Sequence, residues 1–289
     1  MRGCFLPQNE DELVVSIDYV QEELVIMAGE SGDENLRSCY IGDNKKDVHT
    51  NTGSAIYNSQ MRTNIRYDQY AELVEKKDKK ANDIRKVYAK RTNFLVAYGG
   101  GPAGMARKII VPMEMAESFY EAFFLSYPRV KDYQARKIAE AQRFGYVKEC
   151  FGTRRHLNKI FDKSKRVRSS AERQAGNAPI QSGAASVLKK LMSGYVKNSV
   201  AERFGSTIYG PIYDEVVASV PKSNVHAYVE EMANLMEIEL PGLNITLSTS
   251  VSIGHNWGDQ IEIGTRPTAE MVYATIAKIE EKQNAIEHA

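Results

Sequence analysis

The sequence is 289 residues long, with 43% hydrophobic residues, 26% charged residues and a formal net charge of +1. This composition is typical of a globular chain that buries one or two cores. Three widely spaced cysteines exclude a disulfide framework and a cysteine zinc site, and no apolar run approaches the roughly 20 residues that a membrane span needs. We therefore expect a cytoplasmic protein without a membrane partner.

Basic residues gather in two blocks, although the whole chain is nearly neutral. The blocks run from Lys76 to Arg91 and from Arg154 to Arg173. A solvated helix face explains one such block, but two of them favour a polyanionic partner.

The first predicted element is a buried strand over residues 13–18, which ends on Asp18. A helix over residues 22–28 and a turn over residues 29–33 follow. Apolar residues then recur at helical spacing in four segments, near residues 49–57, 67–98, 112–126 and 130–145.

Strand character returns late in the chain, in residues 206–220 and 245–253, on either side of a helix over residues 225–238. This order predicts an α+β fold in which strands from both ends of the chain form one sheet and a helical module projects between them. The last stretch predicts one amphipathic helix with four apolar residues on one face, namely Val272, Ile276, Ile279 and Ile286. Packing of this face on its own domain and contact with a partner are both open.

Carboxylates occupy apolar strands at two distant places in the sequence. Asp18 closes the first strand, and Asp214 and Glu215 lie within the apolar run IYDEVV. Carboxylates that meet at strand ends repel each other, and Mg²⁺ is a good counter-ion because it combines a few carboxylates with phosphate oxygens of a substrate. Pairing of each acid with a remote arginine is the alternative.

Cations and aromatic rings share one face of the helix that follows residue 82, because Lys86, Lys90, Phe94 and Tyr98 recur every four residues. This face suits a nucleoside triphosphate, which needs positive charge at one end and a flat apolar surface at the other. An amphipathic helix with exposed lysines is the alternative. The nearby GGGPAG run also matches a dinucleotide-binding loop, but helical spacing before it and Pro112 after it exclude a Rossmann unit.

Six segments, in order, resemble motifs of family A DNA polymerases, the group of bacterial DNA polymerase I and its phage relatives. SIDYVQEELVIMA resembles motif A, KDVHT the family's DIHT, KVYAKRTNFLVAYG motif B, FGYVKECFGTRR the family's GYVETLxGRRR, NAPIQSGAA its NxPxQGTAAD, and IYDEVV motif C. The resemblance covers residues 2–259 and implies a right-hand palm sheet with a helical fingers insertion. The implied divisions are palm (1–42), fingers (43–176), palm (177–266) and an additional C-terminal amphipathic helix (267–289).

The resemblance also implies a role for each matching residue. Asp18, the Tyr19 position and Asp214 would hold two Mg²⁺ ions, with Glu215 beside them. Lys86, Lys90 and His49 would bind the dNTP phosphates, and Lys90 could protonate the leaving group. Phe94 would stack on the incoming nucleotide, and Tyr98 and Glu23 would form a steric gate against a 2′-hydroxyl.

The remaining matches imply contacts with primer-template DNA. Asn177 and Gln181 would reach the minor groove, and Arg154 and Arg155 the backbone. At two matched positions a difference from the family bears on the site. Lys86 replaces an arginine and so lacks a bidentate fork on phosphate, and Tyr213 replaces a histidine at the primer terminus.

The thumb and the TGRLSS and PNLQNIP segments of the family have no counterpart in this sequence, and neither does an exonuclease domain. We therefore expect a split polymerase, in which a second polypeptide carries the thumb and possibly a 3′–5′ exonuclease, or a polymerase that has lost these parts. If a phage encodes it, its place is the host cytoplasm.

Two other functions remain open from the sequence. A single-subunit RNA polymerase shares the two aspartates and the lysine and tyrosine of motif B, but Glu23 argues against it because a ribonucleotide needs that space. A DNA-binding scaffold that has lost catalysis is the second alternative, and the presence of Asp18, Lys90 and Asp214 argues against it.

Overall fold

The computed structural model describes residues 2–287 and the side chains of residues 2–285. The chain forms two compact units. The sheet unit comprises the residues up to Glu22, Ala184–Glu239 and the residues from Thr246, and the helical unit comprises Glu23–Gly183 and Leu240–Ile245. These limits follow from backbone contacts, and the palm and fingers limits stay a prediction.

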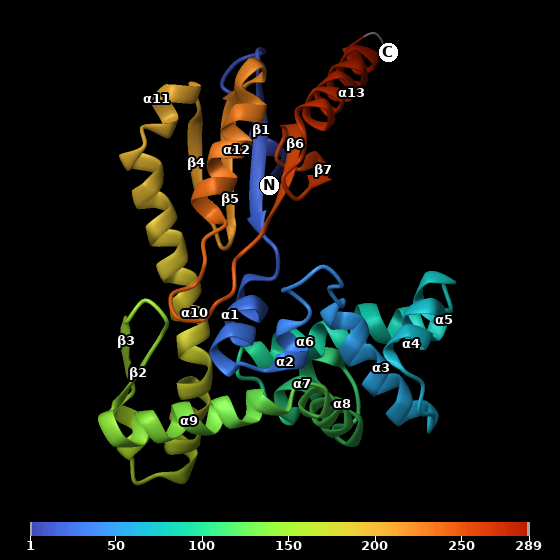
Figure 1. Ribbon diagram of the computed structural model, residues 1–289, viewed down its shortest axis with the longest axis vertical. Helices are drawn as coiled ribbons and strands as arrows, with labels where there is room; N and C mark the ends of the chain where they lie inside the picture. Colours follow the sequence, from blue (N-terminus) through green and yellow to red (C-terminus); the bar gives the residue numbers. More distant parts are fainter. Residues whose placement is uncertain (1, 288–289) are drawn as a thin grey trace. The chain divides into compact units, whose positions relative to one another are not determined.

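The sheet unit is built on five antiparallel strands in the order β4-β5-β1-β6-β7 (Figure 1). Their bounds are β1 (Glu12–Tyr19), β4 (Thr207–Ile212), β5 (Glu215–Pro221), β6 (Thr249–Asn256) and β7 (Asp259–Gly264). The other elements are η1 (Arg2–Cys4), α11 (Val200–Phe204), η4 (Lys222–Asn224), α12 (Val225–Met236) and α13 (Ala269–Glu287). The predicted α+β class is therefore confirmed, with strands from both ends of the chain in one sheet.

The central strand β1 is buried on both faces because α12 covers one side and an apolar cluster covers the other. Val14, Val217 and Trp257 form that cluster. The predicted segment 206–220 is two strands, since the chain reverses between Ile212 and Glu215, and β7 was not predicted at all.

The helical unit contains most of the other elements. They are α1 (Glu22–Ser31), α2 (Glu34–Arg37), α3 (Val48–Met61), α4 (Tyr67–Glu75), α5 (Lys79–Asp83), η2 (Ile84–Ala89), α6 (Lys90–Ala97), α7 (Pro102–Ile109), α8 (Met113–Ser126), α9 (Pro128–Phe144), β2 (Tyr146–Lys148), β3 (Arg154–His156) and η3 (Asn158–Phe161). Helix α10 (Lys165–Lys197) contributes residues to both units.

Two predicted helix limits in this unit are wrong. Helix α1 continues to Ser31 through Gly29, where we expected a turn. Gly29 packs closely against another segment, since a Cβ atom there would lie 2.8 Å from Leu243 Cδ1. Glycine is needed there for close packing and does not break the helix. The predicted helix 67–98 is also divided: η2 has π-helical hydrogen bonding, and α6 begins directly after it at Lys90.

The C-terminal helix α13 packs on its own unit. Val272, Ile276 and Ile279 are buried, Lys222 pairs with Glu280 at 2.9 Å, and α13 contacts β6, β7 and α12. Of the two predicted alternatives, packing of the apolar face on its own domain is therefore confirmed for Val272, Ile276 and Ile279. The Ile286 side chain lies outside the described residues.

Candidate active site

Asp18 and Asp214 lie at the same end of the sheet, where β1 ends and the β4–β5 hairpin turns. Asp18 is the one exposed residue of the eight in β1, and its register partner on β5 is Glu215. The next amide, that of Tyr19, donates a hydrogen bond to the carbonyl oxygen of Asp214 at 3.2 Å. The sheet thus joins the two carboxylates that the sequence places almost two hundred residues apart.

The electrostatics of this pair show uncompensated negative charge. Burial, together with the carboxylates of Asp214 and Glu215, raises the pKa of Asp18 from 3.8 to about 7, although the Arg2 cation opposes this. Burial and Glu215 also raise the pKa of Asp214. Acids whose pKa values rise in this way favour a bound proton or a bound cation.

Glu215 is held by groups of its own. The indole nitrogen of Trp257 donates a hydrogen bond to Glu215 Oε1 at 2.7 Å, and Arg2 lies 3.6 Å from the other carboxylate oxygen. The Arg2 guanidinium also stacks 4.3 Å above the Trp257 ring. These contacts fix Glu215 beside Asp18, so its charge contributes to the site even though one of its oxygens is hydrogen-bonded and the other is near Arg2.

The two tyrosines beside the aspartates differ in exposure. Tyr19 is 3% exposed and points to the opposite face of β1 from Asp18, so only its main-chain carbonyl fits the predicted metal contact. Tyr213 is 91% exposed in the hairpin turn and has a φ of 61°, in the left-handed region that a tyrosine rarely adopts. The turn therefore displays this ring to solvent at some conformational cost.

The donor set at this end of the sheet fits a hard divalent cation that also binds substrate oxygens. Among residues 2–287, no three His, Cys, Asp or Glu side chains gather into a group that could hold a metal alone. Two carboxylates and a carbonyl leave ligand positions open, and Mg²⁺ commonly binds through one or two carboxylates plus substrate phosphates.

In the helical unit, a cavity of about 480 Å³ is lined by the four residues predicted to share a helix face. They are Lys86, Lys90, Phe94 and Tyr98. The rings of Phe94 and Tyr98 are stacked with centroids 6.5 Å apart. The shared face is thus confirmed, even though the π-helical stretch ends between Lys86 and Lys90.

His49 lies beside this aromatic row and is neutral. Its ring centroid is 5.8 Å from that of Phe94. Burial, with the cations of Arg85 and Lys90, lowers its pKa from 6.5 to about 4 against the opposing charge of Asp47. A neutral His49 can offer a ligand a hydrogen bond but not a positive charge.

The contact with Asn93 determines which ring nitrogen of His49 carries the hydrogen. The Asn93 amide oxygen accepts from the Thr52 hydroxyl at 2.8 Å, so its NH₂ group faces His49 Nδ1 at 3.0 Å. Nδ1 is then the acceptor and Nε2 carries the hydrogen. This network leaves the Nε2–H group as the donor for a ligand.

Glu23 and Tyr98 are in direct contact, as predicted. The Tyr98 hydroxyl donates a hydrogen bond to Glu23 Oε1 at 3.0 Å, which connects α1 to the residue that follows α6. This bond ties the end of the aromatic row to α1. The role of the pair as a steric gate stays a prediction.

The predicted DNA contacts come from two elements of the helical unit. Arg154 and Arg155 are exposed on β3 of the small β2–β3 hairpin, and the Arg154 guanidinium stacks 4.9 Å from the Tyr146 ring. Asn177 and Gln181 are one helical turn apart on α10. The buried Asn177 Oδ1 has no hydrogen-bond partner within the described part of the chain, so it remains an unused acceptor.

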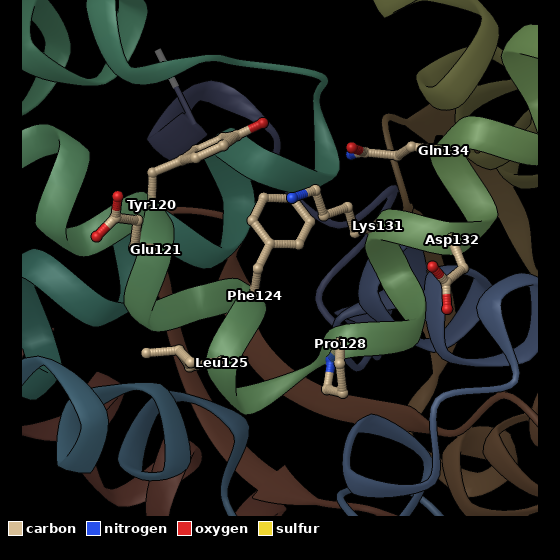
Figure 2. Close-up of a pocket in the computed structure, with 8 residues that line it drawn as sticks. All are labelled: Tyr120, Glu121, Phe124, Leu125, Pro128, Lys131, Asp132 and Gln134. Atoms are coloured by element: carbon tan, nitrogen blue, oxygen red, sulfur yellow. The ribbon is translucent and has the colours of Figure 1, made fainter.

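Two more cations line the α6–α7 cavity; the sequence analysis included Arg91 only as part of a basic block and did not name Lys108. Arg91 follows Lys90 on α6, and Lys108 reaches the cavity from α7. Both lie in segments already discussed, since Arg91 directly follows the fixed Lys90 of motif B and Lys108 ends the GPAGMARK run that we weighed only as a dinucleotide loop. A larger cavity, of about 730 Å³, lies between α8 and α9, and Figure 2 shows Tyr120, Phe124 and Lys131 around it.

Comparisons with known proteins identify the family of the chain. A family model described as DNA polymerase family A matches residues 1–259. The chain is 32% identical over 257 residues to the thermostable DNA polymerase I of Thermus aquaticus and 31% identical over 257 residues to DNA polymerase I of Streptococcus pneumoniae strain R6. These alignments cover 89% of the chain but only 28% and 27% of the relatives, so the chain spans under a third of their length.

One solved structure with a similar fold is the POL domain of Pol1 from M. smegmatis in complex with DNA primer-template and dNTP. The TM-score is 0.72 at 25% identity, and the match covers 89% of this chain and 42% of that one. No helix in residues 2–287 is long and apolar enough to cross a membrane.

Proposed function

Because the chain belongs to DNA polymerase family A, we propose that it is the catalytic palm and fingers part of a DNA-templated DNA polymerase. The observation that supports this most is the meeting of Asp18 and Asp214 at one end of the sheet. Asp18 comes from β1 and Asp214 from the β4–β5 turn, on either side of the helical insertion in the sequence, and their raised pKa values favour a bound proton or cation.

We propose that Asp18, the carbonyl of Tyr19 and Asp214 hold two Mg²⁺ ions. When bound, such ions neutralise phosphate charge and favour ionisation of the primer 3′-hydroxyl. Glu215 keeps the local potential negative, and its bonds to Trp257 and Arg2 fix its position.

The helical unit would bind the incoming dNTP. Lys86 and Lys90 attract its phosphates, and the Nε2–H of His49 donates to a phosphate oxygen without adding charge. The Lys90 ammonium can donate a proton to the leaving pyrophosphate. Phe94 supplies the apolar surface for the sugar and base.

Selection against ribonucleotides would come from Glu23 and Tyr98. Their hydrogen bond at 3.0 Å holds both side chains together, so a 2′-hydroxyl must displace one of them to enter. Asn177 and Gln181 would test base-pair geometry from the minor groove, Arg154 and Arg155 would bind the DNA backbone, and Tyr213 would contact the primer terminus.

We further propose that the active polymerase contains a thumb, and possibly a 3′–5′ exonuclease, in addition to the matched residues 1–259. Purification of the polymerase from the native source, with the mass and sequence of every chain recovered, shows which polypeptide carries these parts. Recovery of an active enzyme that consists of residues 1–289 alone would contradict the proposal.

Primer extension tests the catalytic assignment. The Asp214→Ala variant should lose extension, while Asp11→Ala should not, because Asp11 is an exposed carboxylate at the opposite end of β1. Equal extension by the Asp214→Ala variant and the unmutated protein would instead support a DNA-binding scaffold. Efficient use of NTPs by the unmutated protein would support an RNA polymerase.

A further inference from the structure

The cavity between α8 and α9 has an apolar lining that the proposed function does not use. Tyr120 and Phe124 project from α8 into the space between the two helices, with their ring centroids 4.8 Å apart (Figure 2). Leu125 and Pro128 extend this lining, and Leu125 is 80% exposed. An exposed leucine next to two aromatic rings is typical of a surface that another molecule covers.

Carboxylates border this apolar lining along α8. Glu114, Glu117 and Glu121 follow one another at spacings of three and four residues, so they form an acidic row on one face of the helix. All three are exposed, and Asp132 adds an exposed carboxylate from α9. None of these four acids makes a salt bridge within the described part of the chain, although Lys131 also lines the cavity. The border therefore carries net negative charge.

The charge and the length of this surface restrict what can cover it. Carboxylates repel phosphate groups, which excludes nucleic acid as the occupant. From Glu114 to Leu125 the surface extends about 16 Å along α8. Glu114 and Glu117 lie outside the lining of the cavity, so a small molecule in the cavity would not reach them. An occupant that meets both the apolar lining and the acidic row is a polypeptide segment of about three helical turns.

We propose that the α8–α9 cavity and the acidic row bind a basic amphipathic helix of a partner protein. Leucine or aromatic side chains of that helix enter the cavity, as in other complexes in which a helix lies in an apolar groove. Its lysine or arginine side chains pair with Glu114, Glu117 and Glu121, because charges on a helix recur at the same spacing of three and four residues. Binding at this surface does not require the proposed polymerase activity.

Fluorescence anisotropy with the 289-residue chain tests the proposal. The probe is a labelled synthetic peptide of about four helical turns, with leucines on one face and lysines on the other. The unmutated chain should bind this lysine peptide. Leu125→Asp should bind it about 10-fold more weakly, because a charge then enters the apolar contact. The Glu117→Lys, Glu121→Lys double variant should lose a similar factor, because like charges then face each other.

A second peptide and a matched variant separate this surface from general charge effects. The second peptide has glutamate in place of every lysine; it should not bind the unmutated chain but should bind the Glu117→Lys, Glu121→Lys variant. Glu75→Lys reverses an exposed carboxylate on α4 that does not line the cavity, and it should leave the affinity for the lysine peptide unchanged. All of these substitutions are at exposed positions, so the variants should remain folded.

Three results would overturn the proposal. One is equal affinity of Leu125→Asp and the unmutated chain for the lysine peptide. Another is equal binding of the two peptides by the unmutated chain, which would assign the cavity to an apolar ligand without charge. The third is a dimer in sedimentation equilibrium that Leu125→Asp dissociates, which would assign the surface to a second copy of the chain.

Discussion

The charge of His49 gives a quantitative test of the site. The side chain is 6% exposed, and burial with nearby cations lowers its pKa from 6.5 to about 4. In the unfolded chain the imidazole takes up a proton below pH 6.5, whereas the folded protein resists this until about pH 4. Protonation therefore favours the unfolded chain, and the free energy of unfolding falls as pH decreases through this window.

The magnitude follows from the two pKa values. Their difference corresponds to about 3 kcal/mol when the full shift is counted, and to about 2 kcal/mol at pH 5. At pH 7.5 the effect of His49 is close to zero, since the imidazole is neutral in both states. The decrease in the free energy of unfolding between pH 7.5 and pH 5 is therefore the quantity to measure.

Urea unfolding of the unmutated protein and of His49→Asn at several pH values makes this measurement. The amide oxygen of the new side chain can accept the hydrogen bond from Asn93, but it cannot be protonated in this range. The variant should lose about 2 kcal/mol less than the unmutated protein between pH 7.5 and pH 5. Parallel pH profiles for the two proteins would refute the buried, neutral histidine.

Three other substitutions test separate contacts. Glu23→Ala should raise NTP incorporation relative to dNTP in primer extension, and an unchanged ratio would contradict the gate formed with Tyr98. Gly29→Ala should destabilise the protein by about 1–3 kcal/mol in urea unfolding, because its Cβ would lie 2.8 Å from a Leu243 carbon atom. Lys137→Met should cost about 3–5 kcal/mol at pH 8, since it leaves the buried Glu30 carboxylate without the ion pair at 3.2 Å. The cost should shrink at lower pH, where Glu30 becomes protonated, because burial raises its pKa.

The sequence predicted those features that depend on local pattern. The row of Lys86, Lys90, Phe94 and Tyr98 follows from a spacing of four residues, and motif resemblance placed Asp18 and Asp214 together despite their separation. The strand pairing itself could not be derived, because register depends on contacts between residues distant in the chain.

Features set by tertiary packing escaped prediction. Gly29 reads as a turn signal, but its place in α1 depends on Leu243, more than two hundred residues later. Lys108 reaches the cavity only because α7 packs against α6, which the spacing within one helix cannot show. The neutral state of His49 likewise depends on burial, which outweighs the opposing charge of its sequence neighbour Asp47.

Helix α13 has a practical consequence for handling this protein. The family match ends at residue 259, but Val272, Ile276 and Ile279 beyond it are buried against the sheet unit. A version trimmed to the matched residues would expose their apolar partners to water and would lack the Lys222–Glu280 pair. Such a version should aggregate at concentrations that the 289-residue chain tolerates, so expression boundaries belong after α13.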